Sequence, residues 1–397
     1  MRRLQIYEPR ERALVRAADV ALAPLGWVSS RGDARAEVRR VLLLRLERIG
    51  DLLMVLDAIR DARAAWPAAE IDLAVGSWNA PLARLIPEIT SIDVADAPWL
   101  ARGAGAMSWP ALIAHARGWR HRHYDLVVNF EPDIRSNVLA WLSGAPRRVG
   151  YWSAGGGALL TDALEYAPAA HVSENARVLI ARAAGGDAAA PSRARITPEL
   201  EPPADATARA AERLGPARGP LVGVHVNGGR ESKQWHLDRF ARVARELADA
   251  RGATIVLTGS DADRLMVDVV KRDLANVRVV DASGGMDVPT LAALLARLDL
   301  FITSDTGPMH LAAAMGTPVV ALFGPAQPER YGPRASLERI VRVDLPCSPC
   351  GRVRLPPERC RGHVPDCMDG ITVSAVLHAA NELLDAARPA AGRAATS

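Results

Sequence analysis

The amino-acid sequence predicts an α/β protein made of two doubly wound, parallel-sheet domains with helices on both faces of each sheet. Short apolar runs rich in Val, Leu and Ile alternate with helical segments in both halves of the chain. Because these runs are apolar throughout, they indicate strands covered on both faces, which is typical of parallel sheets. The alternation stops over residues 183–220, which are rich in Pro, Ala and Gly, and then restarts. This interruption indicates two units joined by a connection.

Ten strands justify this class, four in the first half and six in the second. The apolar runs of the first half predict strands at 41–46, 70–76, 124–130 and 148–152. Those of the second half predict strands at 221–226, 254–258, 277–280, 300–303, 319–323 and 340–343. Their spacing suits strand–helix units. Ligands bind such sheets at the carboxyl ends of the strands, so we expect a site in a cleft between the domains.

Helices are expected between and around these strands. They are predicted at 50–65, 206–214, 237–249, 290–297 and 373–387. Residues 11–28 are amphipathic enough for a further helix, and packing against the protein body is favoured over contact with a membrane surface. No stretch of 18 charge-free apolar residues occurs, so no transmembrane helix is expected. The charged N-terminal residues lack the apolar core of a signal peptide, which favours a cytoplasmic protein.

Composition excludes several classes of protein. A chain of 397 residues suits two to three domains at about 150 residues each. The 49% apolar content supports sizeable cores, and the 24% charged content argues against a disordered or collagen-like chain. A net charge of +4, without a run of five basic residues, argues against a nucleic-acid partner. Only two of the 49 basic residues are lysines, Lys233 and Lys271.

The first candidate motif joins the strand at 41–46 to the following helix and reads Arg-Leu-Glu-Arg-Ile-Gly-Asp, ending at Asp51. Gly50 permits a tight turn, and Asp51 is expected at or near the helix N-cap. One interpretation is that Asp51 only caps the helix. The other is that a carboxylate at the carboxyl end of a strand serves as a general base.

The second candidate motif is the loop that follows the strand at 221–226. It includes Asn227, Gly228, Ser232 and Lys233. The two glycines of this loop allow backbone N–H groups to approach a ligand, and Lys233 adds a point charge. The loop suits a phosphate group, although a solvated lysine is the alternative.

The third candidate motif follows the strand at 300–303. Ser304 or Asp305 is expected to cap a helix whose N-terminus presents free N–H groups and a positive dipole end. Thr306 and Gly307 let a diphosphate approach this N-terminus, and His310 lies about one turn further on. Capping alone is the alternative interpretation.

All four cysteines lie in one short segment. Cys347, Cys350, Cys360 and Cys367 are spaced C-x2-C-x9-C-x6-C. A secreted disulfide framework would distribute its cysteines, so this clustering favours a tetrahedral all-thiolate metal site. Zinc is the default metal and iron the alternative. Four protein ligands leave no open position for a substrate, so we expect a structural metal; four unligated thiols are the other interpretation.

Together these motifs resemble glycosyltransferase family 9, the ADP-heptose:lipopolysaccharide heptosyltransferases. The resemblance covers about residues 40–385. It is most specific in IGDLL at 49–53, SKQW at 232–235, and SDTGPMHLAAAMGTPVVALFGP at 304–325.

The resemblance implies a GT-B fold, which consists of two Rossmann-like domains with the active site between them. The implied organisation is an N-terminal extension (1–38), an acceptor-binding domain (39–190), a linker (191–219), a nucleotide-sugar-binding domain containing the cysteines (220–372), and a C-terminal helix and tail (373–397).

The resemblance also implies a role for each motif. Asp51 corresponds to the family's proposed general base and Lys233 to its phosphate-binding lysine. The donor's diphosphate and sugar are assigned to Asp305, Thr306, Gly307 and His310, with Asp261 or Asp263 also near the sugar. No divalent metal is expected at the reaction centre.

Two departures bear on the acceptor and the donor loop. The family usually has a proline where this chain has Asp57, and its His-Pro-Gly loop start reads His-Val-Asn-Gly at 225–228. Arg48, Arg135 and Ser136 are predicted to contact the acceptor because they follow strands, and a phosphorylated, lipid-linked oligosaccharide would suit the arginines. Solvated helix faces are the alternative for each.

The predicted function is heptose transfer from ADP-heptose to an acceptor hydroxyl in lipopolysaccharide core assembly. The cysteines resemble the four-cysteine iron site of related protein heptosyltransferases, which makes a protein acceptor an alternative. Two further alternatives are a sugar-nucleotide 2-epimerase with the same two-domain architecture and a catalytically silent metal-binding assembly protein. The expected location is the cytoplasm, with peripheral contact to the cytoplasmic face of the inner membrane as a variant.

Overall fold

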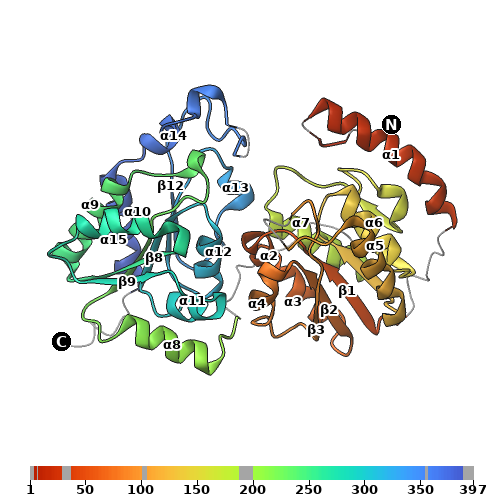
Figure 1. The fold of residues 1–397 in the computed structure, drawn as a ribbon, viewed down its shortest axis with the longest axis horizontal. Helices are drawn as coiled ribbons and strands as arrows, with labels where there is room; N and C mark the ends of the chain where they lie inside the picture. The colour runs from red at the N-terminus through yellow and green to blue at the C-terminus, as the bar shows by residue number, and fades with distance from the viewer. Residues whose placement is uncertain are drawn as a thin grey trace, which may run out of the picture. The chain divides into compact units, whose positions relative to one another are not determined.

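The computed structural model describes residues 4–6, 8–28, 37–100, 105–186, 200–353 and 356–387. The chain forms two compact units, Met1–Arg193 and Ala194–Ser397. Each unit is built on one six-stranded sheet in which all pairs are parallel, with helices around it (Figure 1). The predicted α/β class, with two doubly wound parallel-sheet domains, is confirmed.

The N-terminal unit has the strand order β3-β2-β1-β4-β5-β6. Its elements are α1 (Pro9–Val28), β1 (Arg40–Leu44), α2 (Ile49–Leu53), α3 (Leu56–Ala65), β2 (Glu70–Val75), α4 (Ala80–Ala83), β3 (Ser91–Val94), α5 (Trp109–Gly118), β4 (Leu126–Asn129), α6 (Ile134–Leu142), β5 (Arg147–Tyr151), the 3-10 helix η3 (Gly157–Leu159), β6 (Asp162–Leu164) and α7 (Val172–Ala183). Helices α5 and α6 pack together in one layer, and α3 and α7 in another.

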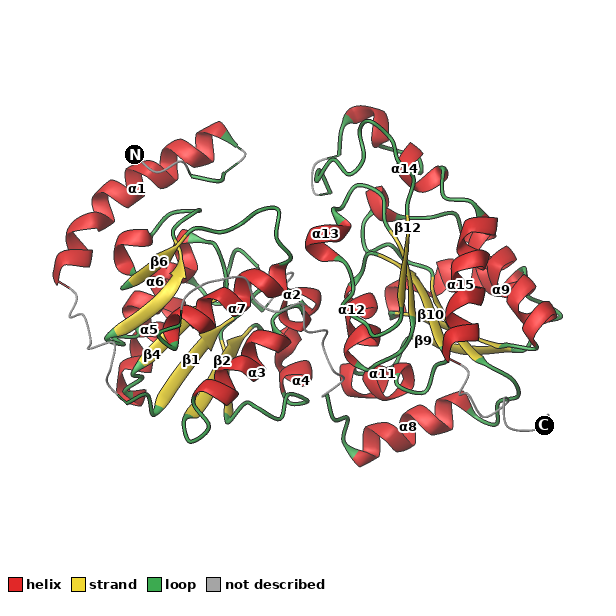
Figure 2. Ribbon diagram, turned by 180° about the vertical axis from the view of Figure 1, so that it is seen from behind, coloured by secondary structure: helices red, strands yellow, loops and turns green. Residues whose placement is uncertain are grey.

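The C-terminal unit has the strand order β12-β11-β10-β7-β8-β9. Its elements are α8 (Ala204–Leu214), β7 (Leu221–His225), the 3-10 helix η4 (Glu231–Lys233), α9 (Leu237–Arg251), β8 (Thr254–Gly259), α10 (Arg264–Arg272), β9 (Val279–Ser283), α11 (Val288–Leu295), β10 (Leu300–Ser304), α12 (Gly307–Ala314), β11 (Val319–Leu322), α13 (Pro328–Tyr331), β12 (Glu338–Val341), α14 (Asp366–Asp369) and α15 (Val373–Ala387). Helices α9, α10 and α15 form one layer, and α8, α11 and α12 the other (Figure 2).

Apolar side chains on the strands explain both layers. In the N-terminal unit, Leu42 and Leu44 of β1 are fully buried in a cluster with Leu112 of α5 and Leu139 of α6. In the C-terminal unit, strand residues share a buried cluster with side chains of α9, α10 and α15. Strands buried on both faces require the near-continuous apolar runs that the sequence shows.

Counted from its own first strand, each sheet has the same order, 3-2-1-4-5-6. In such a sheet the chain runs outward from the centre, returns, and then runs outward in the other direction. The reversal lies between the first and fourth strands, which are β1 and β4 in one unit and β7 and β10 in the other. A doubly wound sheet binds ligands at the carboxyl ends of the strands beside this reversal.

The structure differs from the prediction in two edge strands and one helix. Strands β3 and β6 were not predicted, because they are short edge strands without a continuous apolar run. The single helix predicted at 50–65 is two helices, α2 and α3, separated by a turn at Met54–Val55. The second helix carries the buried Asp57, which accepts a hydrogen bond from Ser173 of α7 at 3.1 Å.

The predicted linker contains a helix that belongs to the C-terminal unit. Within residues 191–219, α8 packs against α11, and the Arg209 guanidinium donates to the Thr290 hydroxyl at 3.0 Å. Residues 191–199 lie outside the described part of the chain. Helix α15 likewise packs on α9 and on β12, and the tail after it also lies outside the described residues. None of the described helices is both long and apolar enough to cross a membrane.

Candidate functional site

Three of the predicted site residues follow strands that flank a reversal of strand order. Asp51 comes after β1, Lys233 after β7, and Asp305 directly after β10. Parallel strands present their carboxyl ends at one edge of the sheet, so Lys233 and Asp305 share an edge of the C-terminal sheet. Asp51 lies at the corresponding edge of the N-terminal sheet.

Asp51 is the third residue of α2, and Arg48 is the N-cap residue. The capping interpretation is therefore refined: the Asp51 carboxylate accepts a hydrogen bond from the backbone N–H of Arg48 at 3.1 Å. The second carboxylate oxygen lies 3.6 Å from the guanidinium of Arg45. The Asp51 side chain is 29% exposed, so it is oriented by two groups and still accessible to a hydroxyl.

Arg45 is a buried cation that organises this edge. Its guanidinium lies 2.9 Å from the Glu47 carboxylate and donates to the backbone carbonyls of Asp51 at 3.1 Å and Phe130 at 3.3 Å. Burial lowers the pKa of Arg45, but the carboxylates of Glu47, Asp51 and Glu131 outweigh burial and keep this pKa above its ordinary value. Arg45 is thus a fixed positive charge beside the candidate base.

Glu131 is a residue that the sequence did not single out. It lies just beyond β4, separated from the strand by Phe130, is buried, and accepts a hydrogen bond from the backbone N–H of Leu46 at 2.5 Å. Burial, followed by the neighbouring Glu47 carboxylate, raises the pKa of Glu131 to about 8, although Arg45 opposes the change. The available signal was an acidic residue just after a buried strand that pairs with β1.

The predicted acceptor residues occupy different environments. Arg48 is exposed, whereas Ser136 is fully buried and its hydroxyl donates to the Asp133 carbonyl at 3.1 Å. Arg135 pairs with the Asp133 carboxylate at 2.9 Å, and its guanidinium lies 4.8 Å from the centre of the Trp99 ring. Ser136 therefore holds the first turn of α6, while the two arginines reach the surface.

Lys233 and Asp305 meet at the edge of the C-terminal sheet. The Lys233 ammonium donates to the backbone carbonyl of Asp305 and lies 3.1 Å from its carboxylate. The side chains are 16% and 12% exposed. An ammonium has three N–H donors, so the contacts with Asp305 leave capacity for a phosphate oxygen. The structure thus fixes the Lys233 charge beside the start of α12.

Helix α12 begins at Gly307, and Thr306 is its N-cap, rather than Ser304 or Asp305 as predicted. The Thr306 side chain makes no capping hydrogen bond to the helix. The first N–H groups of α12 therefore keep their capacity to bind an anion. His310 is buried in the first turn. The Ser304 hydroxyl is also buried and finds no hydrogen-bond partner among the described residues.

The loop before Lys233 is tightly held. A Cβ atom on Gly228 would lie 2.4 Å from the carbonyl oxygen of Lys233, so only glycine permits this close approach. The Gly228 N–H donates to the Gln234 side chain at 2.9 Å. Asn227 donates to the buried carboxylate of Asp263. This hydrogen bond from Asn227 links the loop to the residues after β8.

Asp261 and Asp263 were both predicted near the donor sugar, and the structure separates their roles. Asp263 accepts hydrogen bonds from the backbone N–H and the hydroxyl of Ser260, both at 2.7 Å. Burial raises the pKa of Asp263, but these bonds and the one from Asn227 outweigh it, so the pKa lies below its ordinary value. Asp261 is 74% exposed and pairs with Arg264 at 3.1 Å. Asp263 is thus a structural partner of the loop, and Asp261 is the accessible carboxylate.

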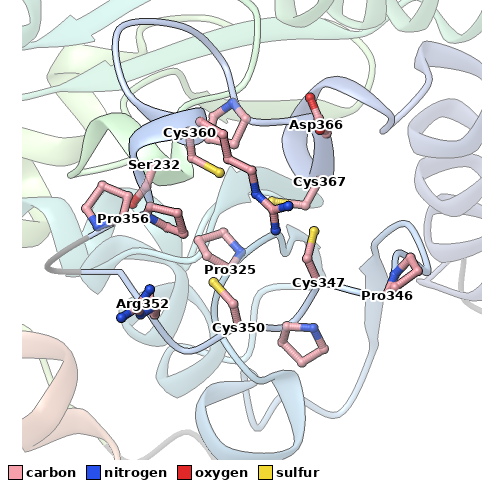
Figure 3. Close-up of a pocket in the computed structure, with 14 residues that line it drawn as sticks. Ser232, Pro325, Pro346, Cys347, Cys350, Arg352, Pro356, Cys360, Asp366 and Cys367 are labelled. Atoms are coloured by element: carbon pink, nitrogen blue, oxygen red, sulfur yellow. The ribbon is translucent and has the colours of Figure 1, made fainter. Parts of the chain in front are cut away.

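The four cysteines line one cavity of about 350 Å³, as Figure 3 shows for their labelled side chains. All four thiols are free of disulfides, and Cys367 is the most buried. Burial, with smaller contributions from the other three cysteines, raises the pKa of Cys367 to about 11. The thiols are therefore close enough to influence one another electrostatically.

Ser232, predicted to bind the donor, lies on the wall of this same cavity (Figure 3). Its buried hydroxyl donates to the carbonyl of Val353 at 3.2 Å. The preceding residue, Glu231, accepts a hydrogen bond from the N–H of Gly362 at 2.9 Å. Both residues belong to η4, which ends at Lys233. The cysteine segment, residues 345–367, is therefore hydrogen-bonded to the loop that carries Lys233.

The same segment also contacts the loop after β11. The Ser348 hydroxyl donates to the Gly324 carbonyl at 2.8 Å, and the Gly351 N–H donates to the Pro325 carbonyl at 2.8 Å. A Cβ atom on Gly324 would lie 3.0 Å from the Cys367 sulfur. The cysteine segment therefore touches two of the loops at the carboxyl edge of this sheet.

The described residues do not form a ready-made metal site. Within the described residues, no three His, Cys, Asp or Glu side chains are grouped closely enough to hold a metal ion. Four free thiols around one cavity are nevertheless the donor set that zinc or iron takes in all-thiolate sites. The residue types thus fit such a metal, while their placement here is looser than a ligand shell.

Comparisons with known proteins agree with this architecture. Lipopolysaccharide heptosyltransferase 2 of Escherichia coli K12 is 24% identical over 314 residues, which cover 77% of this chain and 88% of that protein. The structure of E. coli ADP-heptose lps heptosyltransferase II matches with a TM-score of 0.69 and 20% identity, covering 87% of this chain and 99% of that chain. The iron-containing dodecameric glycosyltransferase TibC of enterotoxigenic E. coli matches with a TM-score of 0.53 and 14% identity, covering 91% of this chain and 78% of that chain.

The family assignment rests on the match to a family model. The model of glycosyltransferase family 9 (heptosyltransferase) matches residues 112–357, more than half of the chain. The match favours a transferase over the 2-epimerase and the silent assembly protein that the sequence left open. Each unit has the doubly wound parallel sheet of a Rossmann-like domain, and two such domains make up the GT-B fold of the matching heptosyltransferase structure. The chain belongs to glycosyltransferase family 9, the heptosyltransferase family, and is a glycosyltransferase with the GT-B fold.

Proposed function

We propose that this enzyme transfers a heptose from ADP-heptose to a hydroxyl of the lipopolysaccharide core. The observation that carries the proposal is the Lys233–Asp305 pair beside the start of α12, whose N-cap Thr306 makes no side-chain capping bond. An ammonium next to helix N–H groups suits the diphosphate of a nucleotide sugar. Relatives named for lipopolysaccharide and ADP-heptose support the donor and the acceptor class.

The proposed reaction is a single displacement at the anomeric carbon of the heptose. Asp51 takes the proton of the acceptor hydroxyl, and the acceptor oxygen bonds to the anomeric carbon. The bond from that carbon to the diphosphate breaks, and ADP leaves with the bonding electron pair. The Arg48 N–H and the Arg45 guanidinium hold the Asp51 carboxylate for this task.

Stabilisation of the leaving group is assigned to the C-terminal unit. Lys233, with the N–H groups of Thr306 and Gly307, would bind the diphosphate as its charge grows. His310, in the first turn of α12, and Asn227 and Gly228, in the loop, complete the proposed donor site. This arrangement supplies positive charge from the protein itself, so no divalent metal is assigned to the reaction centre. The exposed carboxylate of Asp261 is assigned to the donor sugar.

The acceptor is proposed to be a lipid-linked, phosphorylated oligosaccharide. Arg48 is exposed and Arg135 is partly exposed, so both can meet phosphate groups. This acceptor places the enzyme in the cytoplasm with peripheral contact to the inner membrane. A protein acceptor is the second candidate, because the four cysteines resemble the iron site of protein heptosyltransferases and an iron-containing glycosyltransferase is among the matching structures.

We further propose that Cys347, Cys350, Cys360 and Cys367 hold a structural zinc or iron ion. A bound metal would cross-link the cysteine segment and supply no step of the reaction. Elemental analysis of the purified protein should find about one zinc or iron per chain, as a four-thiolate site predicts. The Cys350→Ser variant should lose most of that metal. A stably folded, metal-free wild-type protein would contradict the proposal.

The proposed activity is tested by incubating the full-length protein with ADP-heptose and candidate acceptors. Lipopolysaccharide core lacking heptose, and a peptide acceptor, form the two arms of the experiment. We expect the core acceptor to gain the mass of one heptose and ADP to be released in equal amount. A gain only on the peptide would support the second candidate. Failure of both acceptors to gain a heptose, with ADP-heptose either hydrolysed or left unchanged, would contradict heptose transfer.

A further inference from the structure

Helix α1 lies on the N-terminal unit with one face fixed. A Cβ atom on Gly26 would lie 2.1 Å from the carbonyl oxygen of Ala158, so the helix backbone directly contacts η3. A Cβ atom on Gly155 would lie 2.4 Å from the Val15 side chain. The Asp19 carboxylate accepts a hydrogen bond from the Gly156 N–H. Asp19, one of the two acidic residues of α1, therefore points inward.

The opposite face of α1 combines apolar and basic side chains. Leu14 is 72% exposed and Val20 is 71% exposed, although both are large and apolar. At 100° per residue, these positions fall on one arc of the helix together with further exposed residues. The exposed residues of this arc are Pro9, Arg10, Ala13, Leu14, Arg16, Ala17, Val20, Ala21 and Pro24. The arc holds two arginines and no carboxylate, since Glu11 lies to one side of it.

The position of α1 relates this face to the proposed acceptor site. Helix α1 packs against the residues that follow β5, at the carboxyl edge of the N-terminal sheet. Burial lowers the pKa of Arg135, but Asp133 and, to a smaller extent, the nearby Glu11 carboxylate raise it above its ordinary value. The helix thus lies on the same side of its unit as the residues assigned to the acceptor.

We propose that this outward face of α1 docks on an anionic membrane surface. Leu14 and Val20 would enter the boundary between head groups and acyl chains, and Arg10 and Arg16 would meet lipid phosphates. Interfacial helices combine apolar side chains that enter this boundary with Lys or Arg side chains that are attracted to anionic lipids. A second copy of the chain would present the same two arginines, so charge repulsion disfavours self-association through this face. Docking would help catalysis only if the acceptor is lipid-linked, as in the proposed function. The membrane contact itself does not depend on that function.

Vesicle binding tests the proposal with the full-length protein. In a sedimentation assay, most of the protein should pellet with vesicles of phosphatidylglycerol and phosphatidylcholine. Much less should pellet with vesicles of phosphatidylcholine alone. The double variant Leu14→Glu/Val20→Glu should bind the anionic vesicles at least about tenfold more weakly, because two apolar side chains are replaced by charges. Arg10→Gln/Arg16→Gln should bind more weakly and lose much of the salt dependence.

Leu265→Glu is the matched control, because Leu265 is 81% exposed on the C-terminal unit and should not affect vesicle binding. Equal binding of wild type and the Leu14→Glu/Val20→Glu variant would overturn the proposal. A wild-type dimer in solution that the same variant converts to a monomer would also overturn it. Transfer to a water-soluble acceptor should be unchanged in this variant. Loss of vesicle binding with intact soluble activity therefore separates this inference from the proposed function.

Discussion

The two units share a strand order but differ in the chemistry at their carboxyl edges. Across the reversal of the N-terminal sheet, the buried cation Arg45 is surrounded by the carboxylates of Asp51, Glu47 and Glu131. Across the reversal of the C-terminal sheet, Lys233 meets Asp305 beside a helix N-terminus. Topology therefore determines where a ligand binds, and the residues after the strands determine what each edge can do.

The difference follows from which group is exposed. At the N-terminal edge the cation is 3% exposed and the Asp51 carboxylate 29%, so the edge offers a proton acceptor. At the C-terminal edge the lysine is itself within reach of solvent, and the helix adds N–H donors. The first edge suits a hydroxyl and the second a phosphate. Breaking each edge should therefore give a different kind of defect.

The largest expected effect is the loss of the proton acceptor. Asp51→Asn keeps the size of the side chain but removes its basicity, so the rate of transfer should fall about 10²- to 10⁴-fold. ADP affinity, measured by calorimetry, should stay the same because the donor is assigned to the other unit. Asp61→Asn is the control, since Asp61 pairs with Arg177 on the helices of the same unit. Near-normal turnover in Asp51→Asn would remove this residue from the mechanism.

The next effect concerns the stability of the N-terminal edge. The pKa of Glu131 is raised to about 8 in the folded protein, above its ordinary value of 4.5. The folded state then binds the extra proton between these values, so unfolding free energy should fall as pH rises from about 4.5 to about 8. Glu131→Gln has no carboxyl group to bind this proton. Over this pH range its free energy of unfolding should therefore decrease less than that of wild type, by on the order of a few kcal/mol.

Urea unfolding at a series of pH values measures this difference. Glu70→Gln is the control, because Glu70 is an exposed residue of β2 in the same unit. Wild type and Glu131→Gln should diverge as pH rises, whereas wild type and Glu70→Gln should remain parallel. Parallel curves for all three proteins would contradict the raised pKa of Glu131.

The two lysines give a smaller, matched test of the C-terminal edge. Lys233→Ala removes a charged hydrogen-bond donor and should weaken ADP binding about 10- to 100-fold, which is typical of such a bond. Lys271→Ala should bind ADP normally, because Lys271 lies outside this loop and its ammonium pairs with the Asp281 carboxylate at 3.0 Å. Lys233→Arg should also bind less well if the site needs a compact ammonium. Equal ADP affinity in all variants would end the phosphate assignment.

The smallest expected effect sharpens the role of the cysteine segment. Ser232→Ala deletes the hydrogen bond to the Val353 carbonyl, and the net value of such a bond is about 1 kcal/mol. ADP affinity should fall about fivefold, because the bond holds the loop that carries Lys233. Thr207→Ala, on the exposed side of α8, should leave ADP affinity unchanged. An affinity equal to wild type in Ser232→Ala would show that the segment does not position the loop.

Much of the fold could be predicted because buried parallel strands require apolar residues on both faces. Strands β3 and β6 could not, since a short edge strand has no such requirement. Asp51, Lys233 and Asp305 were predicted because each lies in a distinctive motif after a strand. Glu131 was missed because a single acidic residue after a strand looks like a turn. Its raised pKa depends on burial and on Glu47, which only the tertiary structure supplies.

Contacts between distant segments were equally unpredictable. Ser232 and Val353 are 121 residues apart, and no local pattern predicts their hydrogen bond. The outward face of α1 was visible as amphipathicity, which favoured packing against the body. The structure confirms packing for the inward face, and it shows in addition that Leu14 and Val20 remain exposed.

The repeated strand order has a consequence for how this enzyme can change over evolution. In the described chain each sheet is completed by strands of its own unit, and none is contributed by the other. A sheet built this way can form as soon as its half of the chain has left the ribosome. Recombination near residue 193 would therefore exchange one complete sheet for another. Such chimaeras could acquire a new acceptor while keeping intact the half that is proposed to bind the nucleotide sugar, which offers a direct route to new glycan structures.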